Sequence, residues 1–400
     1  MEFFMQLFPG IGTFFAVEPV IAVARIVLIV FGFVLACLGF KRTLEPLIMV
    51  PMGIGMMAVN CGMMFLTSGT VGNLLLDPLV SDASAIVDAM QVNFLQPIYN
   101  LTFSNGLIAC LVFMGIGARS EISFLLAKPW SSMIIAIFAE MGTFAALAAG
   151  VLAFGLTPEQ SAAMATIGGA DGPTAILTAS KLSVELLPAI AIAAYSYMAL
   201  IPLIQPPLMR LMTTRKMRQV KMSQLRVVSK TEKIIFPIAV TIFVVLLIPD
   251  TAPLIGMLML GNLFRECGVT ERLSDTAQNA LINIVTIPLG LSVGFKATAD
   301  QFLTPQTLGI VALGLTAFLL STAGGLLLGD LMYVLTGGKV NPLIGSAGVS
   351  AVPMAARVSQ VEGQKENPSN FLLMHAMGPN VAGVIGSACA AGFMIKVFGG

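Results

Sequence analysis

One aspartate in a glycine-rich stretch is the residue best suited to chemistry. Asp171 follows Gly168, Gly169 and Ala170 and precedes Gly172, Pro173 and Thr174, inside strongly apolar sequence. A charge at the centre of a membrane costs roughly 2.5–3.5 kcal/mol on insertion scales, and such residues usually serve a function. Glycine and proline interrupt a helix and free backbone carbonyls, which together with Asp171 provide the hard oxygen ligands of a Na⁺ site. The alternative is that Asp171 caps a helix at a surface loop.

A second break, over residues 341–353, supplies neutral oxygens instead of a carboxylate. When the glycines of the two breaks are aligned, Asp171 falls on Ser350. Two such breaks that approach from opposite faces would enclose a small cavity. One carboxylate matches the single charge of Na⁺, and the oxygens of Asn341 and Ser350 would complete the ligand shell.

Three further polar residues follow the second break. Arg357 comes seven residues after Ser350 and is either a cytoplasmic positive-inside residue or a clamp for an anion. Asn380, next to Pro379 in the last apolar stretch, is a candidate ligand of the cation. His375 is the only histidine, so a multi-histidine metal site is excluded, and we expect it to be a hydrogen-bonded helix residue near the interface.

Two tyrosines precede three closely spaced prolines. Tyr195 and Tyr197 come before Pro202, Pro206 and Pro207. Membrane tyrosines are usually interfacial anchors. A helix kinked by proline could instead turn Tyr197 inward, where its hydroxyl could carry a proton.

The composition predicts an all-α polytopic membrane protein. Of 400 residues, 57% are apolar and 10% charged, against roughly 45–50% and 25% in soluble domains. The apolar runs are long and continuous, whereas a β-barrel needs short alternating segments. The net charge of +1 does not favour a nucleic acid as partner, and the five scattered cysteines do not form a metal or disulfide pattern.

The elements that position these residues follow from charge and length. Residues 210–233 hold eight of the 21 Lys and Arg, so this segment is predicted to be cytoplasmic, and the acidic loop 67–96 is predicted to lie outside. Crossings are predicted over residues 20–40, 46–66, 101–117, 130–155, 183–209, 234–248, 253–265, 278–295, 306–335 and 371–395. Residues 158–181 and 340–360 are too rich in glycine, proline and polar residues to span, and we expect each to be a re-entrant hairpin.

The two halves show faint self-similarity. An N-terminal segment with the first transmembrane helix (1–40) precedes a first repeat (41–209), a basic cytoplasmic linker (210–233) and a second repeat (234–400). The repeats start from opposite sides, so they are predicted to be inverted, with about five transmembrane helices and one broken hairpin each. Chance similarity among glycine-rich helices is the alternative.

Several of these motifs resemble the β subunits of the sodium-pumping, biotin-dependent decarboxylases. The likeness is carried by both breaks, by the run 194–200 and by residues 370–387, and it covers nearly all of residues 40–396. The family includes decarboxylases of oxaloacetate, methylmalonyl-CoA, glutaconyl-CoA and malonate. In this chain its functional residues correspond to Asp171, Tyr197, Asn341, Gly345, Ser350 and Arg357, and Asn380 lies in the matching last motif.

The resemblance implies a role within a complex. A carboxyltransferase α subunit loads CO₂ onto biotin on a carrier protein, and the membrane subunit decarboxylates that carboxybiotin while it exports Na⁺ across the bacterial cytoplasmic membrane. A small γ-type subunit and a homo-oligomer, such as a trimer, are further implied partners. The sequence does not identify the acid that the complex decarboxylates.

Roles in that reaction can be assigned on chemical grounds. Loss of CO₂ from carboxybiotin needs an anion holder and a proton source, and Arg357 could hold the carboxylate. Asp171, Ser350 or Tyr197 could relay the proton. Arg357, Asn341 and Gly345 are the expected contacts of the carboxybiotin. The rival interpretation is a stand-alone Na⁺-coupled carboxylate transporter, because inverted repeats belong to that class too; a purely structural anchor would not need Asp171.

Overall fold

Helices make up nearly all of the regular structure. The computed structural model describes residues 9–41, 43, 46–61, 64–65, 71–72, 106–295, 304–351 and 353–399. Within these ranges the strands are the two-residue β1 (Met64–Phe65) and β2 (Val71–Gly72), which pair antiparallel. Nearly all of the predicted outside loop 67–96 lies beyond the described residues. The all-α class is confirmed.

The helices before the basic segment are α2 (Pro9–Ala16), α3 (Pro19–Phe40), α4 (Pro46–Cys61), α7 (Leu107–Arg119), α8 (Ser123–Ala127), α9 (Pro129–Phe154), α10 (Pro158–Ala165), η2 (Thr166–Gly169), α11 (Gly172–Leu182), η3 (Val184–Leu186) and α12 (Leu187–Met212). From the basic segment onward they are α13 (Arg215–Arg218), α14 (Lys230–Leu247), η4 (Pro249–Thr251), α15 (Ala252–Glu266), α16 (Glu271–Asp275), the π-helix η5 (Thr276–Leu281), α17 (Ile282–Phe295), α19 (Pro305–Leu335), η6 (Pro342–Gly348), α20 (Met354–Glu366) and α21 (Leu373–Phe398).

The described residues of the ten predicted crossings are mostly helical, but the crossing predicted over 46–66 is helical only to Cys61, and Met64 and Phe65 form β1. Among the described residues, six helical segments are long and apolar enough to cross a membrane: Pro19–Gly39, Pro129–Phe154, Val184–Met212, Glu271–Gly294, Thr307–Leu335 and Leu373–Phe398. The helices α4, α7 and α15 are shorter, and α14 begins with three charged residues. Large apolar side chains such as Trp130 and Leu152 are exposed on the outside of these helices, as expected of surfaces that face lipid. The chain is a multi-pass membrane protein.

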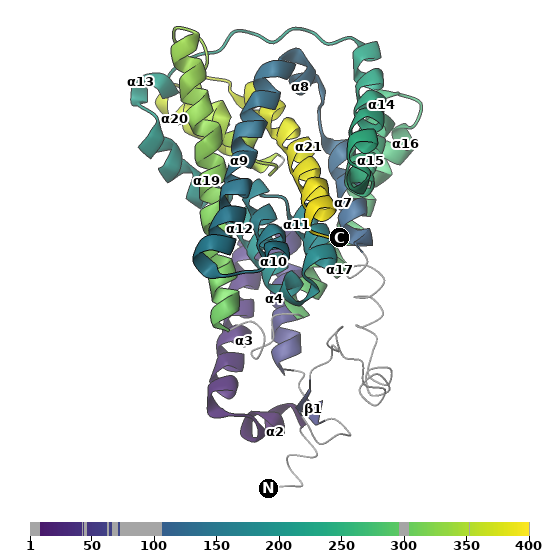
Figure 1. The fold of residues 1–400 in the computed structure, drawn as a ribbon, viewed down its shortest axis with the longest axis vertical. Coiled ribbons are helices and arrows are strands. Elements are labelled where there is room, and N and C mark those ends of the chain that lie inside the picture. Colours follow the sequence, from purple (N-terminus) through teal and green to yellow (C-terminus); the bar gives the residue numbers. More distant parts are fainter. Residues whose placement is uncertain are drawn as a thin grey trace.

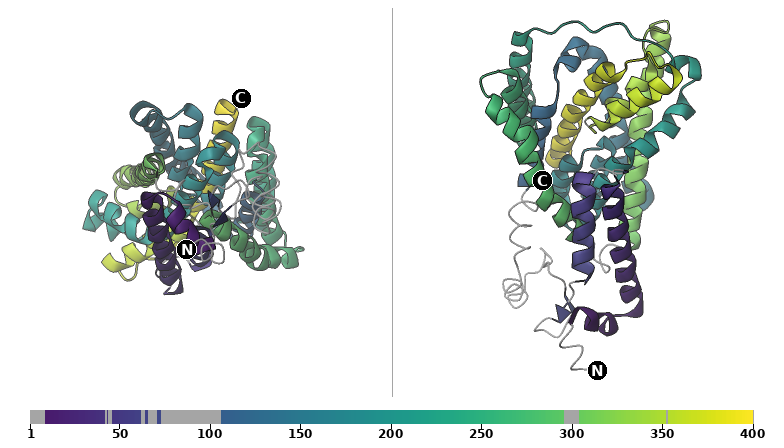
Figure 2. Two further views of the ribbon diagram at one scale, coloured as in Figure 1. Left: turned by 90° about the horizontal axis from the view of Figure 1, so that it is seen from below. Right: turned by 180° about the vertical axis from the view of Figure 1, so that it is seen from behind.

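The short helices lie among the long ones. In Figure 1, α10 and α11 sit in the middle of the molecule beside α9, α12 and α21, while α3 and α4 project at one end and α8, α13 and α20 lie at the other. Figure 2 shows the same division from behind. Helix α9 packs on both α19 and α21, and each of the three packs on η2 and η6. The long helices therefore enclose the two stretches that were predicted to be broken.

Glycines allow the closest of these contacts. A Cβ at Gly142 of α9 would lie 2.2 Å from the backbone nitrogen of Ser321 in α19, so these helices touch through their backbones. Small residues at helix interfaces are typical of membrane proteins, because close packing replaces the hydrophobic effect between helices in lipid.

A candidate cation site where two broken helices meet

The first break is a helix, a tight turn and a second helix. Thr157 and Gln160 form a capping box at the start of α10. The chain then tightens into η2 and reaches Ala170, whose φ of 55° is the one positive value for a non-glycine residue in the described part. Such a conformation costs a non-glycine residue about 1–2 kcal/mol and often marks a functional site. The next residue, Asp171, begins α11, and its Oδ1 accepts a hydrogen bond from the Thr174 nitrogen at 3.3 Å.

The second break meets the first through the backbone. The Ser350 nitrogen donates to the Gly169 carbonyl at 2.8 Å. Ser350 follows η6 and is 179 residues from Asp171 in the chain. Its hydroxyl nevertheless donates directly to the Asp171 carboxylate. The two breaks therefore touch, as expected from the sequence, and the prediction that each is a re-entrant hairpin stays a prediction.

The Asp171 carboxylate is buried among hydroxyl groups. Asp171 is 3% exposed. Its Oδ2 accepts hydrogen bonds of 2.9 Å from the hydroxyls of Ser350 and of Ser387 in α21. In the described residues no lysine or arginine forms an ion pair with it. Asp171 does cap a helix, but in the interior and not at a surface loop. A buried carboxylate without a cationic side chain calls for a bound cation or a proton.

Asn380 holds the second break beside this carboxylate. Its Nδ2 donates to the carbonyls of Ala347 and Val349 at 3.2 and 2.7 Å. Its Oδ1 is buried and has no hydrogen-bond partner in the described part of the chain. Asn380 therefore has an oxygen free to bind a ligand next to Ser350.

Asn341 has different partners. Its Oδ1 accepts from the Leu343 nitrogen and caps η6, and its Nδ2 donates to the carbonyls of Arg218 and Val220, each at 2.9 Å. None of these bonds reaches Asp171. The amide ties the start of η6 to the basic segment, and a role in holding a cation stays a prediction.

Gly345 is a backbone packing position. A Cβ there would lie 2.1 Å from the Gly325 carbonyl oxygen of α19. This contact leaves no space between η6 and α19 for a side chain.

The two tyrosines face different surroundings. The Tyr197 hydroxyl donates to the Val311 carbonyl of α19. It is Tyr195 that packs against the first break, since a Cβ at Gly172 would lie 2.6 Å from its Cζ. The Tyr195 hydroxyl is buried and has no partner among the described residues. The structure thus brings Tyr195, rather than Tyr197, next to Asp171.

Arg357 and His375 lie apart from this cluster. Arg357 is exposed on α20 and takes part in no ion pair within the described ranges. This leaves its guanidinium available to an anion. His375 of α21 is buried, and its Nδ1 has no hydrogen-bond partner in the part of the chain that is described.

Sequence reasoning missed a second buried carboxylate. Glu140 of α9 lies against the first break, because a Cβ at Gly169 would be 3.3 Å from its Oε1. Its Oε2 accepts from the Thr143 hydroxyl at 3.2 Å. The rule that singled out Asp171, an ionisable residue in apolar sequence, applies equally to Glu140. Ser387 was also missed, since a serine in a helix gives no comparable signal.

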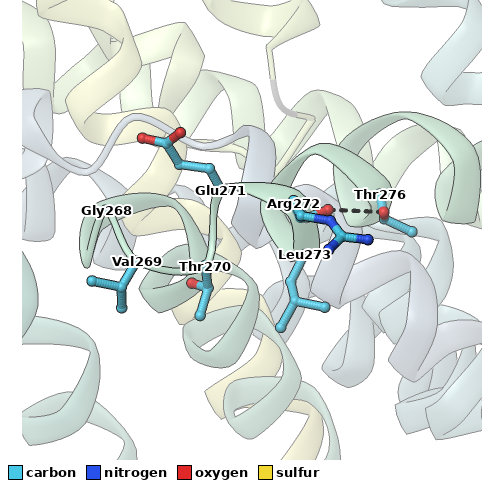
Figure 3. Close-up of a pocket in the computed structure, with 7 residues that line it drawn as sticks. All are labelled: Gly268, Val269, Thr270, Glu271, Arg272, Leu273 and Thr276. Carbon is cyan, nitrogen blue, oxygen red and sulfur yellow. Dashed lines mark hydrogen bonds between the residues drawn. The ribbon is translucent and has the colours of Figure 1, made fainter.

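A separate pocket opens at the turn before α16. Figure 3 shows its lining by Gly268, Val269, Thr270, Glu271, Arg272, Leu273 and Thr276. None of these residues contacts the carboxylate cluster, so the pocket is not part of the candidate site.

Comparison with known proteins decides the family. Residues 24–398 match the family described as Na⁺-transporting oxaloacetate decarboxylase beta subunit. The chain belongs to this family. Like other members of the decarboxylase beta-subunit family, it is a subunit of a multisubunit enzyme, as its motifs predicted.

Three relatives of this beta subunit illustrate the range of the family. The methylmalonyl-CoA decarboxylase subunit beta of Veillonella parvula is 50% identical over 371 residues, 93% of this chain and 92% of that protein. The carboxybiotin decarboxylase of Malonomonas rubra is 48% identical over 397 residues, 99% and 98% of the two chains. The oxaloacetate decarboxylase beta chain 2 of Salmonella typhi is 58% identical over 305 residues, 74% and 70%. Two of these names refer to different substrates, methylmalonyl-CoA and oxaloacetate, so membership of the family does not identify the acid that the complex decarboxylates.

Proposed function

We propose that this beta subunit decarboxylates carboxybiotin on a carrier protein and couples that reaction to Na⁺ export across the bacterial cytoplasmic membrane, with consumption of a proton. The observation that carries the proposal is the buried Asp171, bonded to hydroxyls of two other segments and to no cationic side chain in the described residues. One negative charge among neutral oxygens suits one monovalent cation. The name of the Malonomonas rubra relative supports the carboxybiotin reaction.

The proposed architecture consists of two inverted repeats. An N-terminal segment (1–40) precedes the first repeat (41–209), which a basic cytoplasmic linker (210–233) joins to the second (234–400). Each repeat carries one re-entrant hairpin. The bond between the Ser350 nitrogen and the Gly169 carbonyl supports this arrangement, because it is what two opposed hairpins would form at their tips.

Na⁺ is the cargo of the proposed site. Asp171 supplies the charge, and Ser350 and Asn380 supply oxygens next to it; Asn341 is the further proposed ligand. A hydroxyl that donates to the carboxylate can turn a lone pair toward a cation. Na⁺ and a proton compete for the same oxygens, so arrival of a proton releases Na⁺ outward and the two events are linked.

Decarboxylation breaks the bond between the ureido nitrogen and the carboxylate carbon, releases CO₂ and places a proton on that nitrogen. Arg357 holds the carboxylate, with Asn341 and Gly345 as further contacts of the ring. Asp171, Ser350 or Tyr197 delivers the proton. A poorly hydrated site favours neutral CO₂ over the carboxylate. The proposed partners are a carboxyltransferase α subunit, a biotin carrier protein, a small γ-type membrane subunit and further copies of this chain.

The test uses the assembled complex in liposomes. We expect Asp171→Asn to abolish the uptake of radioactive Na⁺ driven by carboxybiotin, because the site loses its charge. Wild-type Na⁺ transport by this variant would exclude the carboxylate as a ligand. Avidin should stop transport by the unaltered complex, since it blocks biotin; transport that continues in avidin would instead indicate a stand-alone transporter.

A further inference from the structure

A mainly apolar cavity of about 230 Å³ lies at the end of the molecule that carries the basic segment. Its apolar lining includes Phe124 of α8, Met222 and Leu225 of the basic segment, and Ile344 of η6. Pockets for drug-sized ligands measure roughly 300–1,000 Å³, so this cavity suits a single small ring and not a whole large ligand.

The polar groups of the cavity are cationic or hydrogen-bonding. Lys128, Ser131, Ser132 and His375 all line it. Lys128 is half-buried and forms no ion pair within the described ranges. The buried His375 Nδ1 also has no partner there. An ammonium group and hydroxyls at the edge of an apolar cavity suit a carboxylate attached to a compact apolar body.

The cavity touches both elements that hold the second half of the cation site. Ile344 belongs to η6, which leads directly to Ser350, and Pro379 of α21 adjoins Asn380. Asn380 in turn bonds the carbonyl of Val349. A ligand that displaced η6 or α21 would therefore also displace the groups that surround Asp171.

We infer that this cavity, the Lys128 cavity, binds the carboxylated ring of carboxybiotin, with the Lys128 ammonium paired to the ligand carboxylate. The inference rests on the proposed function and adds a binding residue to it. Arg357 does not line the cavity, so the Lys128 cavity is an entry position that the ring occupies before Arg357 holds its carboxylate for the reaction. Met222 and Leu225 place the cavity beside the predicted cytoplasmic segment, from which a carrier protein would deliver its biotin.

The test compares lysine variants in the assembled complex with carboxylated biotin carrier as substrate. We expect Lys128→Met, which keeps the length of the side chain and removes its charge, to raise KM about tenfold while the Na⁺ concentration for half-maximal activity stays unchanged. Lys128→Arg should stay within about threefold of wild type. Lys339→Met is the matched control, because Lys339 adjoins the lining residue Val340 but does not line the cavity itself.

An unchanged KM in Lys128→Met would overturn the inference, provided that the wild-type complex is active. An inactive wild-type complex would instead contradict the proposed function. If the Lys128→Met complex fails to assemble, Leu225→Trp provides the test. Its larger side chain fills the cavity, and it lies in a segment without regular structure, where the substitution disturbs no helix. A raised KM in Leu225→Trp would support the inference, and a wild-type KM would overturn it.

Discussion

At the scale of single residues, hydrogen bonds stabilise the ionised form of Asp171. It accepts from the Thr174 nitrogen and from the hydroxyls of Ser350 and Ser387, which come from three separate segments. Each donor stabilises the ionised carboxylate, and hydrogen bonds to charged groups contribute about 1.5–3 kcal/mol. The affinity for Na⁺ should therefore depend on serines that lie far from Asp171 in the chain.

The first prediction removes one such donor. We expect Ser387→Ala to raise the Na⁺ concentration for half-maximal decarboxylation about 10- to 150-fold, because the carboxylate loses a bond that favours its ionised form. The control is Ser180→Ala, whose hydroxyl donates only to the Leu177 carbonyl of its own helix among the described residues. Equal Na⁺ dependence of the two variants would contradict the role of Ser387.

The second prediction concerns Glu140. Its carboxyl group lies against Gly169, two residues before Asp171, and one of its oxygens has no partner among the described residues. Glu140→Gln keeps the shape of the side chain and replaces a carboxyl oxygen, a ligand type that suits Na⁺, with an NH₂ group, so we expect binding of radioactive Na⁺ to weaken about tenfold. Glu159→Gln, in the first turn of α10 and partly exposed, should bind as wild type. Tighter Na⁺ binding in Glu140→Gln would show that the two carboxylates compete.

At the scale of elements, the second break keeps its shape through contacts between backbones. Gly345 of η6 lies on Gly325 of α19, and a Cβ at Gly383 of α21 would be 2.3 Å from the Gly348 carbonyl oxygen. A 3₁₀ segment has poor hydrogen-bond geometry of its own, so η6 depends on these neighbours.

The third prediction tests this packing. We expect Gly345→Ala to lower the midpoint of thermal unfolding of the purified complex by several degrees or to prevent assembly, because a methyl group would overlap the Gly325 carbonyl oxygen. Gly309→Ala is the matched control in α19, since a Cβ there meets nothing within 4 Å. Its midpoint should stay near that of wild type or rise slightly.

At the scale of the whole molecule, the basic segment is tied to parts of the chain about 150 residues away. Arg218 and Arg215 form ion pairs of 2.8 and 2.9 Å with Glu366 at the end of α20. Asn341 and Asn370 both donate to the carbonyls of Arg218 and Val220. The segment beside the Lys128 cavity is therefore anchored to η6 and to α20.

The fourth prediction follows from the Glu366 carboxylate. A hydrogen bond from Arg218 lowers the pKa of Glu366 from its ordinary value of 4.5. Its contribution to anchoring is thus complete above about pH 4.5 and is lost as the pH falls through the lower, folded-state pKa. Hydrogen exchange of residues 213–229, corrected for intrinsic rates, should be faster at pH 3 than at pH 6.

A neutral variant imitates the protonated state at neutral pH. In Glu366→Gln we expect trypsin to cleave the basic segment several times faster than in wild type, because both ion pairs are lost. Glu159→Gln, which removes a partly exposed charge in the first turn of α10, should leave the cleavage rate unchanged. Unchanged cleavage in Glu366→Gln would show that the asparagine bonds alone hold the segment.

The sequence by itself determined the helices and the position of the breaks. Continuous apolar runs mark the spans, because the free energy of crossing a membrane is a sum over some 20 neighbouring residues. Glycine and proline mark the breaks around Asp171 and Ser350, because they act on the backbone where they stand. Both signals are local, so they can be recognised without knowledge of the fold.

Only the tertiary structure decided which polar groups share a site. Ser387 and Glu140 reach the first break, Tyr195 takes the position beside Gly172, and Asn341 turns to the basic segment. The partner of a buried polar group depends on how segments far apart in the chain cross and how closely their backbones approach. Sequence spacing carries no measure of that approach, and so the contents of the site became known only when the helices were packed.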